Sequence, residues 1–271
     1  MLDAVRCPFF RKAFAYSAPI GFLAGLVGLG GGEFRLPVLM HVIGFAARSA
    51  IVLNLVISFV ALVFAFAVRG LAVPFADILG FAPAIAGLIC GGIVSALWGA
   101  RLVQRLSDAR IITLMVVLLA GLGALLIAES FFAVEPRGWL PPDWPPHFGL
   151  GILIGLAVGA VSSILGVAGG ELLIPALMLA FGADIKTAGS ASAMISLAII
   201  AAGLWRHHAA GAFALGRGAQ RIVASMSLGS IIGAVAGGLA VAYAPGGLLK
   251  LLLGCILLAA AAKTAIEGRR Q

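Results

Sequence analysis

Charged residues are scarce in this sequence. Asp, Glu, Lys and Arg together make up 10% of its 271 residues, whereas a soluble domain usually carries about 25%. A large hydrophobic core does not explain the deficit, because the surface of a soluble protein still needs polar side chains that face water. The scarcity of charge therefore excludes an ordinary soluble domain.

The sequence also lacks the patterns of common catalytic and metal-binding sites. Its three cysteines, Cys7, Cys90 and Cys255, lie far apart without CxxC spacing, so neither a disulfide framework nor a zinc site is indicated. There is no HExxH motif, no phosphate-binding P-loop and no nucleophile-and-base arrangement that we can recognise. We therefore expect that the protein is not an enzyme and that it has no catalytic residue, metal or cofactor.

Basic residues outnumber acidic ones and give a formal net charge of +8. We exclude nucleic acid as a partner, because the basic residues lie between apolar runs instead of forming one stripe. The runs approach the ~20 residues that a helix needs to cross ~30 Å of hydrocarbon. They predict an all-α, polytopic helical protein in a lipid bilayer. The simple runs are Ile51–Val68, Ile78–Trp98, Ile111–Ala128, Gly189–Trp205, Ile222–Ala244 and Leu248–Ala262, and two longer ones are Ala13–Gly44 and Gly149–Gly182.

An internal repeat covers most of the chain. Residues Gly28–Met40 match Gly166–Met178 at an offset of 138 residues, and the shared GGExxxP pattern is too specific to be a chance match between glycine-rich segments. The same offset pairs Ser58 with Ser196. We predict three parts, which are a first repeat over residues 1–132, a proline-rich linker over 133–148 and a second repeat over 149–271.

Each repeat begins with a segment that is too long for one simple crossing. A helix over residues 14–44 would extend roughly 46 Å, well beyond the hydrocarbon thickness. A glycine run and the proline after it interrupt this segment. One interpretation is a kinked crossing, which gives eight spans in total. The other is a re-entrant hairpin of two half-helices, which leaves three full crossings per repeat and inverts the second repeat relative to the first.

Positive charge favours the hairpin, because Lys and Arg collect on the cytoplasmic side of a membrane protein. With a cytoplasmic N-terminus, and leaving aside Arg35 within the break, the hairpin places outside only Arg69, Arg137, Lys186 and Lys250. The eight-span alternative instead moves outside Arg48, Arg101, Arg105 and Arg110. We therefore predict two inverted repeats, each with a broken, re-entrant first segment plus three transmembrane helices, and cytoplasmic N- and C-termini.

The two breaks, Gly30–Pro37 and Gly166–Pro175, are the strongest candidates for a binding site. Half-helix N-termini carry unpaired N–H groups and partial positive charge, which favour anions. In an inverted pair the two breaks would face each other near the middle of the bilayer. The alternative is a pair of kinks that serve packing alone.

Glu33 and Glu171 occupy equivalent positions in the two breaks. An ionisable group at membrane depth costs about 2.5–3.5 kcal/mol on insertion scales and therefore usually has a role. One role is proton coupling, in which each carboxyl group carries a proton. The other is capping of the helix that follows each break, where a carboxylate accepts N–H bonds. The two roles are compatible.

Further polar residues lie in and after the breaks. Arg35 has no equivalent in the second repeat, where Leu173 stands. Its guanidinium could bind an oxyanion in a bidentate manner, pair with Glu33 or extend to the membrane interface. The helix after each break carries one polar stripe, which could bind substrate or form interhelical hydrogen bonds. The stripe residues are Asn54 and Ser58 in the first repeat and Ser192 and Ser196 in the second.

A ladder of small residues at every fourth position is typical of close helix packing. Its members are Gly87, Gly91, Ser95 and Gly99, with Ser225, Gly229, Gly233 and Gly237 as their equivalents.

The motifs GLGGGxxxxP at Gly28–Pro37 and GxxGGxxxxP at Gly166–Pro175 resemble the sulfite exporter TauE/SafE family, which includes the toluenesulfonate-uptake permeases. The resemblance covers nearly the whole chain and implies a bacterial inner-membrane transporter of sulfur oxyanions or organosulfonates. Many members carry an apolar residue in place of Glu33 and Glu171, so these residues indicate a subgroup with another substrate or coupling. The binding region implied by the motif is Gly30, Gly31, Gly32 and Pro37 with Gly169, Gly170 and Pro175.

We therefore expect a secondary transporter of a small anion, such as sulfite or an organosulfonate, with proton coupling as an open question. The expected location is the cell inner membrane. Two alternatives remain at this point: a passive anion channel and a membrane accessory subunit that does not transport. The direction of transport and the formation of a homo-oligomer are also left open.

Overall fold

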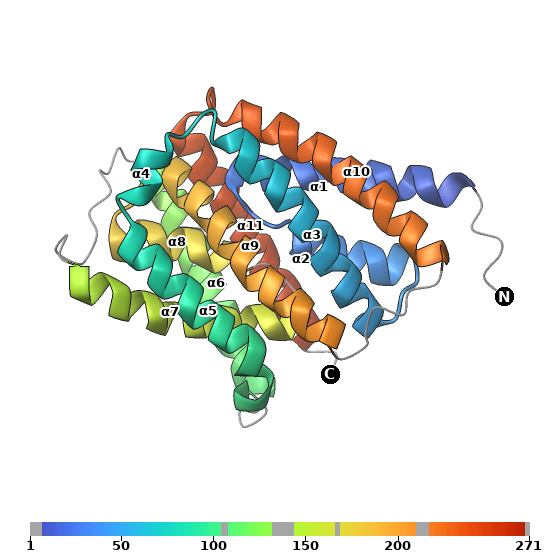
Figure 1. Cartoon of the computed structure of the whole chain (residues 1–271), viewed down its shortest axis with the longest axis horizontal. Coiled ribbons are helices and arrows are strands. Elements are labelled where there is room, and N and C mark those ends of the chain that lie inside the picture. The colour runs from blue at the N-terminus through green and yellow to red at the C-terminus, as the bar shows by residue number, and fades with distance from the viewer. Residues whose placement is uncertain (1–6, 104–107, 132–143, 166–168, 210–216, 269–271) are drawn as a thin grey trace.

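The computed structural model describes residues 7–103, 108–131, 144–165, 169–209 and 217–268, and every regular element in them is helical (Figure 1). This confirms the expected all-α class. The first repeat contains α1 (Cys7–Val27), α2 (Gly32–Pro37), the π-helix η1 (Val38–Val42), α3 (Ala47–Arg69), α4 (Phe75–Leu79), α5 (Ala82–Val103) and α6 (Asp108–Phe131). The second contains α7 (Trp144–Leu165), α8 (Gly170–Phe181), α9 (Ile185–Ala209), α10 (Arg217–Ala240) and α11 (Gly246–Gly268).

Five of the six simple apolar runs each fall on a single helix, within a few residues at most ends. One run differs, because the segment predicted to begin at Ile78 is divided into α4 and α5. Gly80 ends α4 and Pro83 lies in the first turn of α5, where a proline needs no amide donor. Most of the predicted linker, residues 132–143, lies outside the described residues, and α7 begins at Trp144.

The two repeats correspond helix by helix at the 138-residue offset, and they run in opposite directions. α3 packs against its equivalent α9, and Arg69 at the end of α3 bonds to Lys186 at the start of α9. α6 packs against its equivalent α11 in the same antiparallel manner, since Gly247 lies beside Ser130 while Gly254 lies beside Gly123. The second repeat is therefore inverted relative to the first, as Figure 1 also shows for α3 and α9.

The remaining long helices pair between the repeats, because α1 packs along α10 and α5 packs along α7. The small-residue ladder forms these contacts. A Cβ atom added to Gly233 would lie 2.0 Å from the Ala18 carbonyl oxygen, and one added to Gly91 would lie 2.2 Å from that of Ile152. No side chain fits at such distances, which confirms the packing role of these glycines. The surroundings of Gly99 lie outside the described residues.

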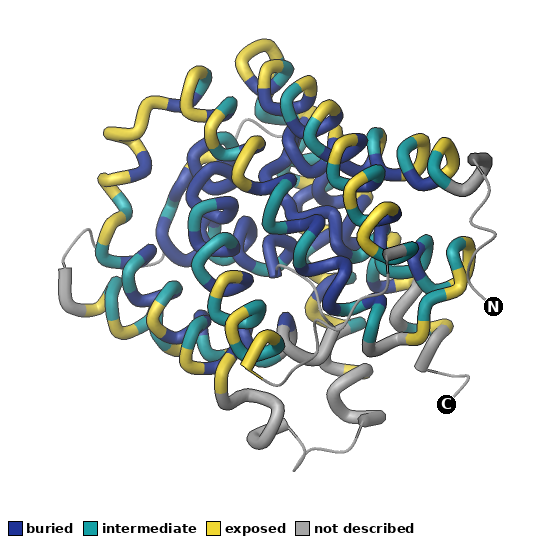
Figure 2. The backbone as a smooth tube through the Cα atoms, turned by 45° about the vertical axis from the view of Figure 1, so that its right-hand side comes forward, coloured by how far each residue is buried: buried dark blue, intermediate teal, exposed yellow. Residues whose placement is uncertain are grey.

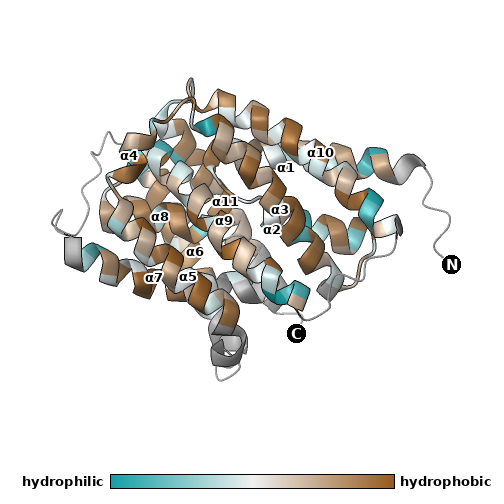
Figure 3. Ribbon diagram, in the orientation of Figure 1, coloured by the Kyte–Doolittle hydropathy of each residue, from teal (hydrophilic) through white to brown (hydrophobic). Residues whose placement is uncertain are grey.

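Buried residues gather in the centre of the bundle and exposed ones lie on its outside (Figure 2), and hydrophobic residues make up most of the long helices (Figure 3). Several of the exposed side chains are large and apolar. Val117 is 65% exposed, Leu153 65% and Leu228 54%. Such surfaces are favourable against lipid and unfavourable in water. Among the described residues, three helices are long and apolar enough to cross a membrane alone, namely Ser49–Arg69, Ile185–Ala209 and Gly218–Ala240, and shorter apolar helices accompany them. The chain is a polytopic helical membrane protein.

Candidate functional site

The first break lies between α1 and α2 and consists of glycines. α1 ends at Val27, and Gly28 and Gly31 have φ angles of 95° and 66°, in the left-handed region that favours glycine. The prediction that Pro37 also interrupts the segment was wrong, because the chain stays helical from Gly32 through Pro37 into η1. Pro37 is the last residue of α2, and the helix changes from α to π directly after it, where the proline lacks an amide donor.

In the second break the structure describes Gly169, which corresponds to Gly31 of the first. Gly169 has a φ angle of 74° and precedes α8, which continues through Pro175. This proline therefore does not form the break either. Gly166, which the sequence placed at the start of the break, lies with residues 167 and 168 outside the described residues. The sequence thus located both breaks, and the structure limits them to the glycines before each short helix.

The two breaks meet inside the protein. A Cβ atom added to Gly170, the first residue of α8, would lie 3.4 Å from Cα of Leu29 in the first break. The same atom would lie 3.3 Å from Oγ of Ser192 on α9. The flanking glycines Gly30, Gly31, Gly32 and Gly169 are buried as well. The inverted repeats therefore bring both interrupted segments to one buried junction.

Asn54 and Ser192 occupy equivalent positions but differ in their hydrogen bonding. Asn54 Nδ2 donates a 3.2 Å hydrogen bond to the Gly32 carbonyl and so fixes the start of α2 to α3. Ser192 is fully buried, and its Oγ has no hydrogen-bond partner among the residues that the structure describes. A buried hydroxyl without a partner usually indicates a bound group or water. Ser192 is therefore a buried polar side chain at the junction whose hydroxyl is not used by the described protein contacts.

Arg35 is fully buried, and it holds α2 against two other helices, α3 and α10. Its Nη1 donates to Ser58 Oγ at 2.9 Å and to the Gly30 carbonyl at 3.4 Å, and its Nη2 donates to Ser230 Oγ at 3.1 Å. Ser230 in turn bonds to Ser17 Oγ at 2.6 Å. The alternative that Arg35 extends to the membrane interface is wrong, because its side chain is 0% exposed. Within the described residues, its Nε has no acceptor.

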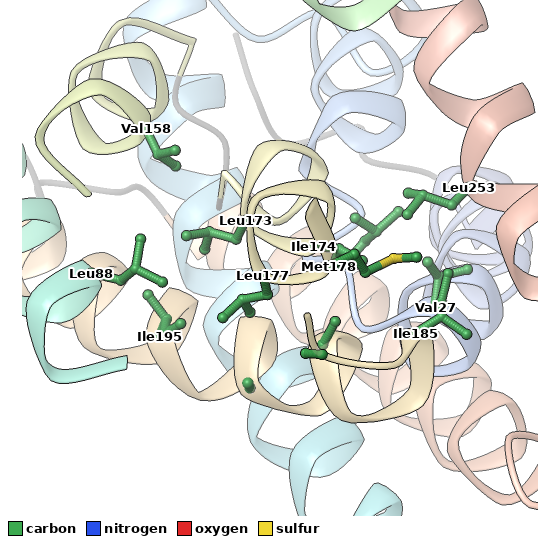
Figure 4. Close-up of a cluster of buried hydrophobic side chains, with 14 of the residues drawn as sticks. Val27, Leu88, Val158, Leu173, Ile174, Leu177, Met178, Ile185, Ile195 and Leu253 are labelled. Carbon is green, nitrogen blue, oxygen red and sulfur yellow. The ribbon is translucent and has the colours of Figure 1, made fainter. Parts of the chain in front are cut away.

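Leu173, the equivalent of Arg35, lies in a purely apolar environment. Figure 4 shows Leu173 pointing toward Leu88, Val158 and Ile195, which belong to α5, α7 and α9. Ile174, the next residue along α8, lies on the side toward Val27. The half-helix of the second repeat is therefore packed by apolar contacts, whereas that of the first is held by a charged group and serines.

Glu33 and Glu171 both lie in the first turn of their half-helices. Glu171 is 6% exposed, and both carboxylate oxygens of Glu33 are buried atoms. The positive end of a helix stabilises a carboxylate at this position. The same position places each carboxyl group within one turn of the junction, where the charge of a bound anion would act on it.

Ser58 and Ser196 are both buried. Ser58 accepts the hydrogen bond from Arg35 and therefore belongs to the polar cluster of the first repeat. Together, the glycines, Asn54 and Ser192 lie at the junction of the breaks. Arg35 and Ser58 lie one helical turn farther along α2 and α3.

Arg69 has a role that its place in the sequence does not reveal. The charge count placed Arg69 and Lys250 at the outer side of the membrane; in the fold, Arg69 is 0% exposed and hydrogen-bonds to α1 and α9. Lys250 forms a 3.0 Å ion pair with Glu129 between α11 and α6. Both residues follow or lie within apolar runs, so only the three-dimensional contacts reveal their partners. No group of three or more metal-ligating side chains occurs in the described part of the chain.

Comparison with known proteins agrees with this architecture. Residues 5–126 and 143–271 match the family described as Sulfite exporter TauE/SafE. No curated protein and no solved structure matched the chain. Since the family match includes both repeats and omits only the linker between them, the chain belongs to the sulfite exporter TauE/SafE family, which consists of membrane transporters of sulfur-containing anions.

Proposed function

We propose that this protein is a secondary transporter that binds a small sulfur oxyanion or organosulfonate between its two helix breaks. The observation that carries the proposal is the meeting of the start of α8 with the first break at Gly170 and Leu29. The positive end of α8 and the unpartnered Ser192 hydroxyl there suit an oxyanion, which accepts N–H and O–H hydrogen bonds. The proposed ligands are the break glycines and Ser192, with Arg35 adding positive charge nearby.

The paired glutamates suggest how protons could be coupled to transport. A carboxylate at Glu33 or Glu171 would repel an anion at the same helix ends, whereas a protonated carboxyl group would not. Proton binding and anion binding would therefore favour each other, and thermodynamic linkage makes this effect reciprocal. We accordingly propose that protons and the anion are bound together.

The inverted repeats suggest how access could alternate between the two sides. Gly30, Gly31, Gly32, Gly169 and Gly170 are buried, so an anion would reach the junction only after helices move apart. Two inverted halves can exchange their arrangements, which opens the same site first to one side of the membrane and then to the other. This supports a transporter over a permanently open pore.

The proposed orientation places both termini on the cytoplasmic side of the cell inner membrane. It rests on the distribution of basic residues, including Arg217 at the start of α10. Accessibility of cysteines substituted for Arg217 and Arg105 tests it, although Arg105 lies outside the described residues. Labelling of either position from the outer face would overturn the orientation.

Uptake into proteoliposomes tests the transport proposal. Purified protein is reconstituted and assayed with radiolabelled sulfite, sulfate, thiosulfate and a small sulfonate, with and without an imposed pH gradient. We expect saturable uptake of at least one of these anions. Flux that rises in proportion to the gradient without saturation would indicate a channel. No flux of any anion, together with a tightly bound protein partner, would indicate an accessory subunit.

A further inference from the structure

Arg69 is a buried cation at the boundary between the two repeats, and the proposed anion site does not use it. Its guanidinium donates to the carbonyl oxygens of Gly25 at 3.0 Å and Leu26 at 2.8 Å, in the last turn of α1. It also donates to Ser190 Oγ at 3.0 Å and to the Lys186 carbonyl at 2.8 Å, in the first turns of α9. One side chain of α3 thus joins the helix before the first break to the second repeat.

The early end of α1 explains why a guanidinium is needed there. In a continuous helix, the carbonyl groups of Gly25 and Leu26 would accept hydrogen bonds from the amides four residues later. The amide of Leu29 instead bonds to the Ala24 carbonyl at 3.1 Å. Arg69 therefore supplies donors to carbonyl groups that the break deprives of their helical partners, which a buried site requires.

Around Arg69, the backbones of α1 and α9 are in direct contact. A Cβ atom added to Gly28 would lie 2.2 Å from the Gly189 carbonyl oxygen. One added to Gly189 would lie 2.3 Å from the Val27 carbonyl oxygen and 2.5 Å from Nη2 of Arg69. The end of α1, the start of α9 and the guanidinium therefore leave no room for another side chain.

The second repeat cannot form the same junction at the opposite end of the bundle. The equivalent of Arg69 is His207, whose imidazole has only two nitrogens and cannot donate to four acceptors. The neighbouring Arg206 instead donates a 2.8 Å hydrogen bond to the Ala96 carbonyl of α5. The two ends of the bundle are therefore held by different chemistry.

We propose that Arg69 is a positioning residue that holds the first break against α9 and keeps the α4 end of the bundle closed. That this closure takes part in alternating access rests on the proposed function. The closure itself can be measured without any substrate. Breaking the Arg69 contacts should separate α1 from α9 locally and expose the first turns of α9, while the opposite end of the bundle stays packed.

The experiment measures how fast a thiol reagent labels single cysteines in purified protein. All three native cysteines are first removed by Cys7→Ser, Cys90→Ala and Cys255→Ala. One reporter is Thr187→Cys, at a buried position in the first turn of α9 beside the Arg69 junction. The control reporter is Ile222→Cys, at a buried position near the start of α10, at the opposite end of the bundle.

Arg69→Met removes all four hydrogen bonds of the guanidinium. We expect it to raise the labelling rate of Thr187→Cys by at least on the order of tenfold, the effect that the loss of a single charge-assisted hydrogen bond would already give. Labelling of Ile222→Cys should not change. Arg206→Met is the matched control variant and should leave Thr187→Cys unaffected. Arg69→Lys keeps the positive charge but not the planar guanidinium, so it should raise the labelling rate of Thr187→Cys by a smaller factor. It is also the milder variant, to be used if Arg69→Met does not fold.

Unchanged labelling of Thr187→Cys in the folded Arg69 variants would overturn the proposal. An equal increase at Ile222→Cys would overturn it as well, because it would show that Arg69 supports the whole bundle and not one end. Neither outcome depends on anion uptake. If the protein transports an anion but the Arg69 variants do not change the labelling, only the proposal for Arg69 fails. If the labelling changes as predicted but no anion is transported, only the proposed function fails.

Discussion

Leu173 occupies in the second repeat the position that Arg35 occupies in the first, and both side chains are fully buried. Arg35 bonds to serines of α3 and α10, whereas Leu173 packs against Leu88 and its apolar neighbours. Equivalent positions of the two half-helices are thus held by hydrogen bonds of a guanidinium in one repeat and by apolar packing in the other. This difference allows a structural role of Arg35 to be separated from a role in anion binding.

Arg35→Leu is expected to destabilise the protein by about 2–5 kcal/mol, because it leaves buried polar groups without their donor. Combining it with Ser17→Ala, Ser58→Ala and Ser230→Ala should restore most of the loss, since the first repeat then resembles the apolar second one. The measurement is the thermal unfolding temperature of the protein in detergent. A combined variant that is less stable than Arg35→Leu alone would contradict the expectation.

The combined variant also tests whether Arg35 contributes to anion binding. If its charge contributes to anion binding, the combined variant should fold normally and still show a raised KM for uptake. Wild-type kinetics in a stable combined variant would assign Arg35 to structure alone.

Ser192→Ala should weaken anion binding without reducing stability. The Ser192 hydroxyl has no hydrogen-bond partner within the described residues, so its removal breaks no described contact. A hydrogen bond to an anion contributes about 1.5–3 kcal/mol, which predicts a KM for uptake about tenfold or more above the wild-type value. Ser230→Ala is the matched control, because this hydroxyl bonds to Ser17 and Arg35 and its loss should lower the unfolding temperature.

Gly28→Ala should prevent normal folding. The φ angle of Gly28 is 95°, and an added Cβ would lie 2.2 Å from the Gly189 carbonyl oxygen, so strain and a backbone clash combine. Gly203→Ala is the control, because a Cβ there meets nothing within 4 Å. Relief of helical glycine entropy should stabilise that variant by about 0.5–1 kcal/mol. The yield of monodisperse protein and its unfolding temperature measure both effects, and a well-folded Gly28→Ala protein would argue against this geometry of the break.

Glu33→Gln and Glu171→Gln should flatten the pH dependence of uptake. In the wild type, the affinity for the anion should rise as pH falls, because protonation removes a negative charge beside the site. A glutamine is neutral at every pH, so each variant should bind the anion with less pH dependence, and the double variant with almost none. The measurement is KM for uptake from acidic to neutral pH. A full wild-type pH dependence in the double variant would reject the proton role of both residues.

Much of the fold could be predicted from the sequence because the membrane imposes simple rules. Apolar runs near the crossing length fall on helices, and the repeated GGExxxP motif reveals the duplication. The 138-residue offset also predicts which helices are equivalent. The division at Gly80 was missed, because a short turn within an apolar run leaves little change in composition.

The site was predicted less completely. Glycine motifs located both breaks, but the prolines suggested longer interruptions than the structure has, since the helix continues through each proline although it lacks an amide donor. The different hydrogen bonding of Asn54 and Ser192 depends on side-chain geometry that no spacing encodes. Arg69 looked like an ordinary charge at the end of a span, and only the folded chain places its guanidinium at the carbonyl groups that end α1.

The most direct test of the account places a methyl group where the two breaks meet. In the Gly170→Ala variant the added carbon would lie 3.3 Å from Ser192 Oγ, at the position proposed for the anion, and the backbone of Leu29 is close but not overlapping. The measurement is equilibrium binding of whichever radiolabelled sulfur anion the wild type takes up, with Gly203→Ala as control. The account predicts at least a tenfold loss of affinity in folded Gly170→Ala protein and none in the control. Equal affinity in all three proteins would contradict the placement of the anion between the breaks.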